Sequence, residues 1–372
     1  MASIVKSVEY LTIDYDATSE PVTTNLTKGQ DETQCVPFFT KQLVAGALVD
    51  DWRERTVKLE IIDNGGTAAV KATATGKTDA DDHRLKIFVV EFETAINVQQ
   101  IDLDIADTNT SNTAACTSVG ASTAEAFLLS YYCFTHTVAI DRPDYGLCRP
   151  IFNSTTQVQA ERVGNVGNID GVVYVVDCDS GEFVVDHRDI AIVSTDELTN
   201  ETISATVLAD SFVIMHAKSN EGGDDPIDAS FVADLSTTTN VRVRRAIVGT
   251  PGAAATVSVQ VVECQNNEWL VQRGDWTSSS TNPDTITITA VTEANSIVKT
   301  GTHESSVYEL GTSDLAAGTV VDDLGAAFHF NSNVQLGVDR QQTTETSNIV
   351  PWEVIDFTGS GGPENPWNYY AQ

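Results

Sequence analysis

The stretch that decides the fold is "IFVVEFETAINVQQ", from Ile87 to Gln100. Its pattern of two aliphatic residues, an acid and then Phe or Cys returns in "VYVVDCDSGEFVVDH" (173–187), "VQVVECQNNEWLVQR" (259–273) and "PWEVIDF" (351–357). Aligned on the first aliphatic residue, the copies start at positions 89, 175, 261 and 354, so they lie 86, 86 and 93 residues apart. A pattern that returns at a nearly fixed spacing indicates tandem units.

Two further landmarks keep the same order and period. The segment "ETISATVLADSFVIMHA" (201–217) matches "DTITITAVTEANSIVKT" (284–300), and "STAEAFLLSYYC" (122–133) lies one period earlier. The second landmark is "VQAER" (158–162), which matches "VRVRR" (241–245). A period near 86 is longer than the roughly 20–50 residues of solenoid units and fits a small β domain.

The texture within each copy is β throughout. Thr, Val and Ile alternate with polar residues, and turn-rich breaks such as "DNGG" and "GTPG" separate the runs. The best candidate for a helical turn is "DASFVADL" (228–235). We therefore predict an all-β protein of tandem antiparallel β-sandwich domains. The predicted parts are a variant N-terminal unit at 1–104, repeats at 105–190, 191–276 and 277–357, and a Gly-rich linker with an aromatic tail at 358–372.

The repeated motif has a predicted place inside each unit. Both faces of "LKIFVVEF" (85–92) are apolar for most of its length, which is typical of a central strand covered on both sides. The motif acid at 91, 177, 263 or 356 stands beside a turn and a new apolar run, so we predict that each motif strand forms a hairpin with the next strand. We expect the acid to be a rim carboxylate that pairs with backbone or arginine rather than a catalytic group or a metal ligand.

The six cysteines form no CxxC pair and no zinc framework. Cys178 and Cys264 occupy the position that Phe92 and Phe357 hold in the other copies, so we predict that both are buried in the core. Cys133 and Cys148 are close enough in sequence for a local disulfide, which spacing alone does not establish.

The composition of the chain argues against two classes of partner, nucleic acids and the membrane interior. The chain has 53 acidic and 21 basic residues and a formal net charge of −32, which repels phosphate and argues against nucleic-acid binding. An acidic, lysine-poor surface is also typical of proteins from strong brine. No apolar run is long enough for a transmembrane helix, and "MASIVKSVEYLTIDYD" lacks the apolar centre of a secretory signal, so we predict no membrane insertion.

Motifs of known chemistry are missing from the sequence. It contains no GxSxG elbow, HExxH, Walker loop or GxGxxG, and its six histidines are scattered. We therefore predict no catalytic residues, no cofactor and no dedicated metal site. Calcium is the one inorganic ligand that stays open, because "DADD" (79–82) and "GGDDPID" (222–228) carry oxygen ligands without the ordered pattern of a calcium loop.

Tandem β copies with a Val-Val-Glu-Phe strand and a "VQRGDW" strand (271–276) resemble structural proteins of tailed phages and archaeal tailed viruses. The segment "NLTKGQDETQCVPFFT" (25–40) is similar to segments of such proteins. The resemblance implies a virion component, such as a capsid decoration, turret, tail-associated or fibre protein. Its partners would be other virion proteins and copies of itself, and it would be assembled in the host cytoplasm.

The two ends of the chain differ from the middle and supply candidate contact residues. Residues 1–56 replace a standard half-unit with a variant that contains "CVPFF" and "DDWRER", and the tail "TGSGGPENPWNYYAQ" (358–372) carries aromatic residues beyond a Gly-rich linker. Terminal units often cap or attach an array. We therefore expect the following side chains to contact neighbouring subunits: Phe38, Phe39, Trp52, Trp367, Tyr369 and Tyr370.

Two other function classes stay open from the sequence. One is a cell-surface or secreted adhesive repeat protein whose loops bind a host-surface glycan or receptor. The other is a polysaccharide-degrading enzyme of a virion spike, which would need a unit-specific insertion rich in acids. The largest irregular segment, "ADTNTSNTAACTSVGAS" (residues 106–122), is rich in Thr and Ser instead.

Overall fold

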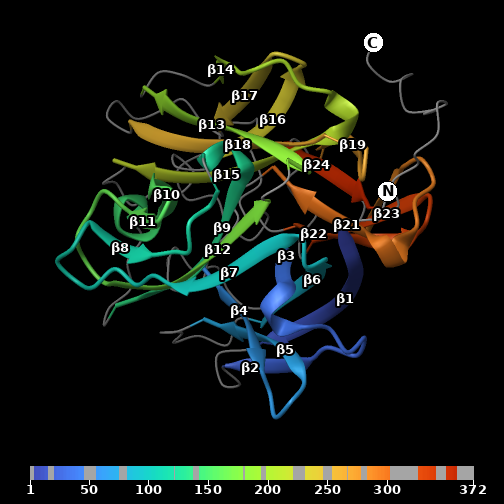
Figure 1. Ribbon diagram of the computed structural model, residues 1–372, viewed down its shortest axis with the longest axis horizontal. Helices are drawn as coiled ribbons and strands as arrows, with labels where there is room; N and C mark the ends of the chain where they lie inside the picture. The colour runs from blue at the N-terminus through green and yellow to red at the C-terminus, as the bar shows by residue number, and fades with distance from the viewer. Residues whose placement is uncertain are drawn as a thin grey trace.

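The computed structural model describes residues 4–15, 21–45, 56–74, 82–120, 122–136, 142–178, 181–193, 198–220, 231–245, 254–265, 267–277, 283–301, 326–340 and 349–357. In this part of the chain the protein is built almost entirely from antiparallel β-strands (Figure 1). The all-β fold with tandem sandwich repeats is therefore confirmed.

Each motif strand is the middle strand of a three-stranded sheet. The four sheets have the orders β1-β6-β3, β7-β12-β9, β13-β18-β15 and β19-β24-β21. Their strands are β1 (Val5–Tyr15), β6 (Asp82–Phe92), β3 (Cys35–Ala45), β7 (Ile96–Asp102), β12 (Asn168–Cys178), β9 (Ala126–Thr135), β13 (Phe183–Ile192), β18 (Ala255–Cys264), β15 (Ser211–Ser219), β19 (Leu270–Thr277), β24 (Ile349–Asp356) and β21 (Ser296–Thr300). The buried aliphatic pairs of these middle strands confirm that they are central and covered on both sides.

A second three-stranded sheet accompanies each of these. Its orders are β2-β5-β4, β8-β11-β10, β14-β17-β16 and β20-β23-β22. The strands are β2 (Val22–Asn25), β5 (Ala68–Thr73), β4 (Lys58–Asp63), β8 (Ser111–Ala115), β11 (Gln157–Glu161), β10 (Arg149–Ser154), β14 (Leu198–Thr202), β17 (Asn240–Arg245), β16 (Phe231–Thr237), β20 (Asp284–Thr287), β23 (Gln335–Arg340) and β22 (Ala326–Ser332). We call the six-strand groups unit 1 (β1–β6), unit 2 (β7–β12), unit 3 (β13–β18) and unit 4 (β19–β24).

The predicted hairpin at the motif is wrong. β6 pairs with β1 and β3, whereas β7 pairs with β12, so the turn at residues 93–95 carries the chain from one unit to the next. An apolar strand, a short turn and a second apolar strand suit either arrangement, and the sequence does not show which partner each strand takes. Our predicted domain boundaries at 104/105, 190/191 and 276/277 follow or cut the first strand of units 2 to 4. They stay a prediction, because strand pairing does not show which segment folds by itself.

The predicted helical turn at 228–235 is also wrong where the structure describes it. Phe231–Thr237 forms β16, which pairs antiparallel with β17. Phe231, Ala233 and Leu235 pack into the same hydrophobic cluster at every second position, the period of a strand. Residues 228–230 lie outside the described part.

The four units close into a ring. A short 3-10 helix of each unit contacts the first strand of the next unit, and this relation returns from unit 4 to unit 1. The four pairs are η1 (Glu32–Gln34) with β7, η2 (Thr123–Glu125) with β13, η3 (Leu208–Asp210) with β19 and η5 (Glu293–Asn295) with β1. β22 also lies beside β3 (Figure 1), where Phe328 N donates to Thr40 Oγ1 at 2.9 Å.

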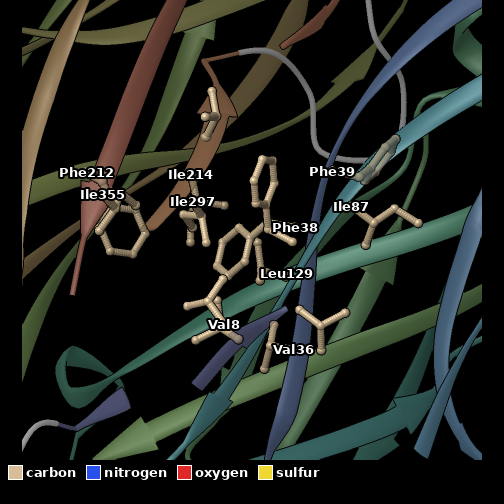
Figure 2. Packing of buried hydrophobic residues seen from close by; sticks show 14 of the residues in the cluster. Val8, Val36, Phe38, Phe39, Ile87, Leu129, Phe212, Ile214, Ile297 and Ile355 are labelled. Atoms are coloured by element: carbon tan, nitrogen blue, oxygen red, sulfur yellow. The ribbon is translucent and has the colours of Figure 1, made fainter. Parts of the chain in front are cut away.

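The larger of two buried hydrophobic clusters in the described residues runs through this ring. Residues of all four units belong to it, among them Phe38 of unit 1, Leu129 of unit 2, Ile214 of unit 3 and Ile297 of unit 4 (Figure 2). The chain exposes 13836 Å², close to the roughly 14,400 Å² expected for a compact protein of 40.0 kDa. Four separate units would expose about 21,000 Å². The units therefore do not form an extended string.

Cys178 and Cys264 are buried in the same core, as predicted. Cys133 and Cys148 are buried and are not joined by a disulfide, so the bond that the sequence left open is not present. Burial raises the pKa of the Cys148 thiol to about 12, so this thiol stays protonated at neutral pH.

A recurring ion pair crosses the unit junctions. The first strand of units 2, 3 and 4 carries an Asp at one equivalent position, and each Asp faces a basic residue from the second sheet of the preceding unit. The pairs are Asp102 with Lys58 at 3.7 Å, Asp189 with Arg149 at 2.7 Å and Asp275 with Arg244 at 2.7 Å. Unit 1 has Thr12 at this position. The repeat therefore reuses polar residues to hold neighbouring units together.

Candidate functional site

A pocket of about 400 Å³ lies where unit 2 meets unit 3. One wall is the start of β13, from Val184 to His187, and another is the segment 204–206 before η3. Thr123 and Ala124 of η2 close it from unit 2, and Val261 and Glu263 of the motif strand β18 complete it. Its volume is within the range of small-molecule and side-chain sites.

Strand alternation explains why β13 lines a pocket. Phe183 and Val185 point into the core, whereas Val184 is exposed and Asp186 is half-buried. Segment 204–206 is fixed next to this strand, because Ser204 N donates to Asp186 Oδ2 at 2.7 Å. The Asp186 carboxylate also accepts from Arg188 at 2.9 Å. Burial opposes these contacts, but together they hold the pKa of Asp186 below its usual value, so it is ionised at neutral pH.

His187 joins the two units at the back of the pocket. Its Nε2 lies 2.9 Å from Thr123 O and 3.0 Å from Ala126 O, and the ring packs edge-on against Phe152. Both oxygens are acceptors, so Nε2 carries the proton. Burial lowers the pKa of His187, and the ring is therefore neutral at pH 7. Nδ1 is left as an acceptor that has no hydrogen-bond donor within the described residues.

Glu263 lies at the edge of the same pocket and is half-buried. Its Oε1 accepts from Val207 N at 2.9 Å. Next to it, Asp210 is buried and its Oδ1 has no hydrogen-bond partner among the described residues. Burial and then the charge of Glu263 raise the pKa of Asp210 to about 6. The pocket is thus acidic on one side and apolar on the other.

This arrangement fits binding better than catalysis. Within the described residues, no hydroxyl or thiol donates to His187, and the Thr206 and Ser211 hydroxyls bond to each other. The imidazole Nε2–H is used on backbone carbonyls, where it fastens η2 to β13. What the pocket offers to a ligand is acceptor atoms, negative charge and an apolar wall.

The predicted pairing of the motif acid with backbone is confirmed for two of the four acids, because Glu91 accepts from Asp31 N at 3.0 Å and Glu263 accepts from Val207 N at 2.9 Å. Glu91 is buried, however, and does not lie at the rim as predicted. Asp177 and Asp356 are buried at the equivalent positions.

Two of the six predicted contact residues, Phe38 and Phe39, lie in the described part of the chain. Phe38 and Phe39 are buried in β3, and Phe39 packs edge-on against Tyr131 of unit 2. These two side chains serve contacts within the chain and do not form an exposed surface, because the variant N-terminal unit is part of the closed ring. The other four candidates lie outside the described residues: Trp52, Trp367, Tyr369 and Tyr370.

Metal and membrane features can be stated only for the described part. There, no group of three or more His, Cys, Asp or Glu side chains could hold a metal ion. The side chains of both acidic segments considered for calcium, 79–82 and 222–228, lie outside it. No helix in the same part of the chain has the length and apolar character needed to cross a bilayer.

Sequence reasoning noted His187 and Glu263 but missed the pocket. The available signal was a difference between copies, because Val207 stands where the other units have Asp31, Ser122 and Thr292 before the 3-10 helix. An exposed Val at a capping position is unusual. No known family model matches this chain, and no curated protein matches it either.

Proposed function

We propose that this protein is a non-enzymatic structural component of a virus particle of the tailed-phage or archaeal tailed-virus class, acting through contacts with other virion proteins and with copies of itself. The observation that carries the proposal is that the recurring polar residues form ion pairs between neighbouring units. At three junctions the equivalent Asp of a first strand pairs with the preceding unit, which is the use expected of a scaffold. The resemblance of the repeats to virion proteins supplies the class.

The closed ring favours a compact component over a fibre stem. A stem built from tandem units would stack them end to end, whereas here unit 4 contacts unit 1 and the exposed area is that of one globule. Among virion components, a capsid decoration, turret or tail-associated protein fits this shape best. The excess of acid, at a net charge of −32, would keep the free subunit soluble before assembly.

The test is whether the protein bands with particles. Particles from cultures that produce the chain are purified on a density gradient, and an antibody against the recombinant protein is used for immunoblotting and immunogold microscopy. We expect the chain at the particle density and gold at regular positions on intact particles. Recombinant protein added to purified particles and banded again controls for adsorption. A chain found only at the cell surface or in the free protein fraction would contradict the proposal and favour the adhesive class.

A further inference from the structure

The four motif acids are not equally covered. Glu91, Asp177 and Asp356 have exposed fractions of 2%, 1% and 6%, whereas Glu263 is half-buried and opens onto the pocket between units 2 and 3. The same acid in the same strand position is therefore enclosed in three units and accessible in one. The groups that bind and cover this acid in unit 1 therefore indicate which chemical group could bind in the pocket of unit 3.

In unit 1 the acid holds an ammonium group. Lys6 Nζ donates to Glu91 Oε1 at 2.6 Å, and Ser7 Oγ donates to Glu91 Oε2 at 2.9 Å. In unit 3 the residue opposite the acid is Val184 in place of Ser7. Among the described residues, no lysine or arginine pairs with Glu263. Within this part of the chain, its carboxylate therefore has no counterpart of the Lys6 ammonium group.

The loop beside the motif acid also differs between units 1 and 3. Glu9 accepts from Thr27 N at 2.8 Å just as Asp186 accepts from Ser204 N, so the two loops superpose at this point. In unit 1, Lys28 continues from there and its Nζ donates to Val8 O, while Gln30 Nε2 donates to Ser7 Oγ at 3.0 Å.

In unit 3 this loop is one residue shorter, counted between the equivalent pairs Leu26–Asp31 and Ile203–Val207. It has Ala205 in place of Lys28 and Thr206 in place of Gln30. In unit 1, the amino group of Lys28 and the amide of the buried Gln30 reach β1 at this site and bond to it. Short side chains leave this site open in unit 3, and the result is the pocket of about 400 Å³.

We propose that this pocket binds a primary alkylammonium group, with the Glu263 carboxylate as the ion partner and the Val184–Val261 wall against the alkyl stem. A lysine side chain of another protein and a free alkylamine share this chemistry. Burying the stem while the ammonium meets a carboxylate is the usual way in which lysine is accommodated. The negative charge of the whole chain would draw a cationic ligand toward the site. The inference concerns the pocket itself and does not rest on the proposed function.

The test uses the full-length protein and two probes at constant ionic strength. The probes are n-butylammonium and a short neutral peptide with one lysine, and the reporter is the backbone amide NMR signal of Val207, which donates to Glu263 Oε1. We expect a saturable shift with both probes, and no shift with the same peptide after acetylation of its lysine. Saturation by butylammonium alone would support a free amine as the ligand, and equal or tighter binding of the peptide would support a protein lysine.

Three variants make the test specific. Glu263→Gln keeps the acceptor for Val207 N but removes the charge, and it should weaken binding about tenfold or more. Ala205→Lys, which copies Lys28 into an exposed position, should abolish binding because the pocket is filled from within. Glu293→Gln removes one charge from η5 of unit 4 and should change nothing. Equal shifts in all variants, or a linear response without saturation, would overturn the proposal, because both indicate a general charge effect.

Discussion

Gln260 of unit 3 bonds to both backbone groups of Leu128 of unit 2. Leu128 N donates to Gln260 Oε1 at 2.7 Å, and Gln260 Nε2 donates to Leu128 O at 2.8 Å. Leu128 lies in β9, the edge strand of its sheet, so no further strand is present to satisfy these groups. The side-chain amide takes the place of the missing neighbour, which protects an edge and joins two units at once.

Replacing Gln260 by Leu should lower the free energy of unfolding by about 2–4 kcal/mol. The substitution leaves a buried N–H and a buried C=O without partners, and each costs about 1–3 kcal/mol. Urea unfolding followed by circular dichroism measures the change. The matched control is Gln272→Leu, because Gln272 makes the same two bonds to Thr289 at an exposed position, where water can replace it. Equal losses in the two variants would contradict the explanation from burial.

The equivalent edge in unit 3 is satisfied by an ion pair. Val213 N donates to Glu353 Oε2 at 3.0 Å, and Lys299 Nζ donates to Val213 O. Lys299 and Glu353 are both buried, with Nζ 3.5 Å from Oε2. Gln260 pairs across its sheet with Ile214, at the positions that Glu353 and Lys299 hold in unit 4. The neutral pair Ile214–Gln260 of unit 3 therefore satisfies an edge-strand N–H and C=O, as the charged pair Lys299–Glu353 does in unit 4.

The guanidinium of Arg273 also lies 3.4 Å from Glu353 Oε1, so all variants are made in an Arg273→His background, which copies His187 of unit 3. In this background we predict that Lys299→Ile alone destabilises the protein by about 3–5 kcal/mol, because it leaves Glu353 charged and buried without a cation. The double variant Lys299→Ile, Glu353→Gln copies the pair of unit 3 and should recover most of that loss. Thermal and urea unfolding of the two single variants and the double variant form a double-mutant cycle. A double variant no more stable than Lys299→Ile would show that the two junctions are not interchangeable.

The repeated motif was enough to predict which residues are buried and which strands are central. It was not enough to predict how the strands pair or how the units are arranged in space. The exchange of Cys178 for Phe92 at one position predicted burial correctly, and the apolar character of both faces of "LKIFVVEF" predicted central strands. The partner of each strand was not predictable, because β7 is as compatible with β6 as with β12. Ring closure depends on contacts such as Thr40 with Phe328, which are 288 residues apart and have no local signature.

The pocket illustrates the same limit at the candidate site. Its walls come from η2, β13, segment 204–206 and β18, and only the fold brings them together. The loop difference between Lys28 and Ala205 is visible in the sequence once the copies are aligned. Its meaning depends on knowing that Lys28 bonds to β1, the strand that pairs with the motif strand of Glu91, which no spacing rule provides.

Asp210 gives a prediction for the dependence of stability on pH. Its pKa is raised from 3.8 to about 6, first by burial and then by the charge of Glu263. A raised pKa means that the folded protein holds this proton more tightly than the unfolded chain. The stabilisation is therefore complete below about pH 4 and is lost as the pH rises through about 6. At pH 7 the buried carboxylate is a net cost.

Asp210→Asn should therefore stabilise the protein at pH 7 by about 1–3 kcal/mol and leave its stability at pH 4 nearly unchanged. Asn occupies the equivalent position in unit 4, Asn295, so the neutral amide is compatible with this 3-10 turn. Urea unfolding at both pH values measures the difference, and the pH 4 data are the internal control. A gain of equal size at pH 4 and pH 7 would mean that Asn improves packing or hydrogen bonding there, and that the charge of Asp210 is not the cause.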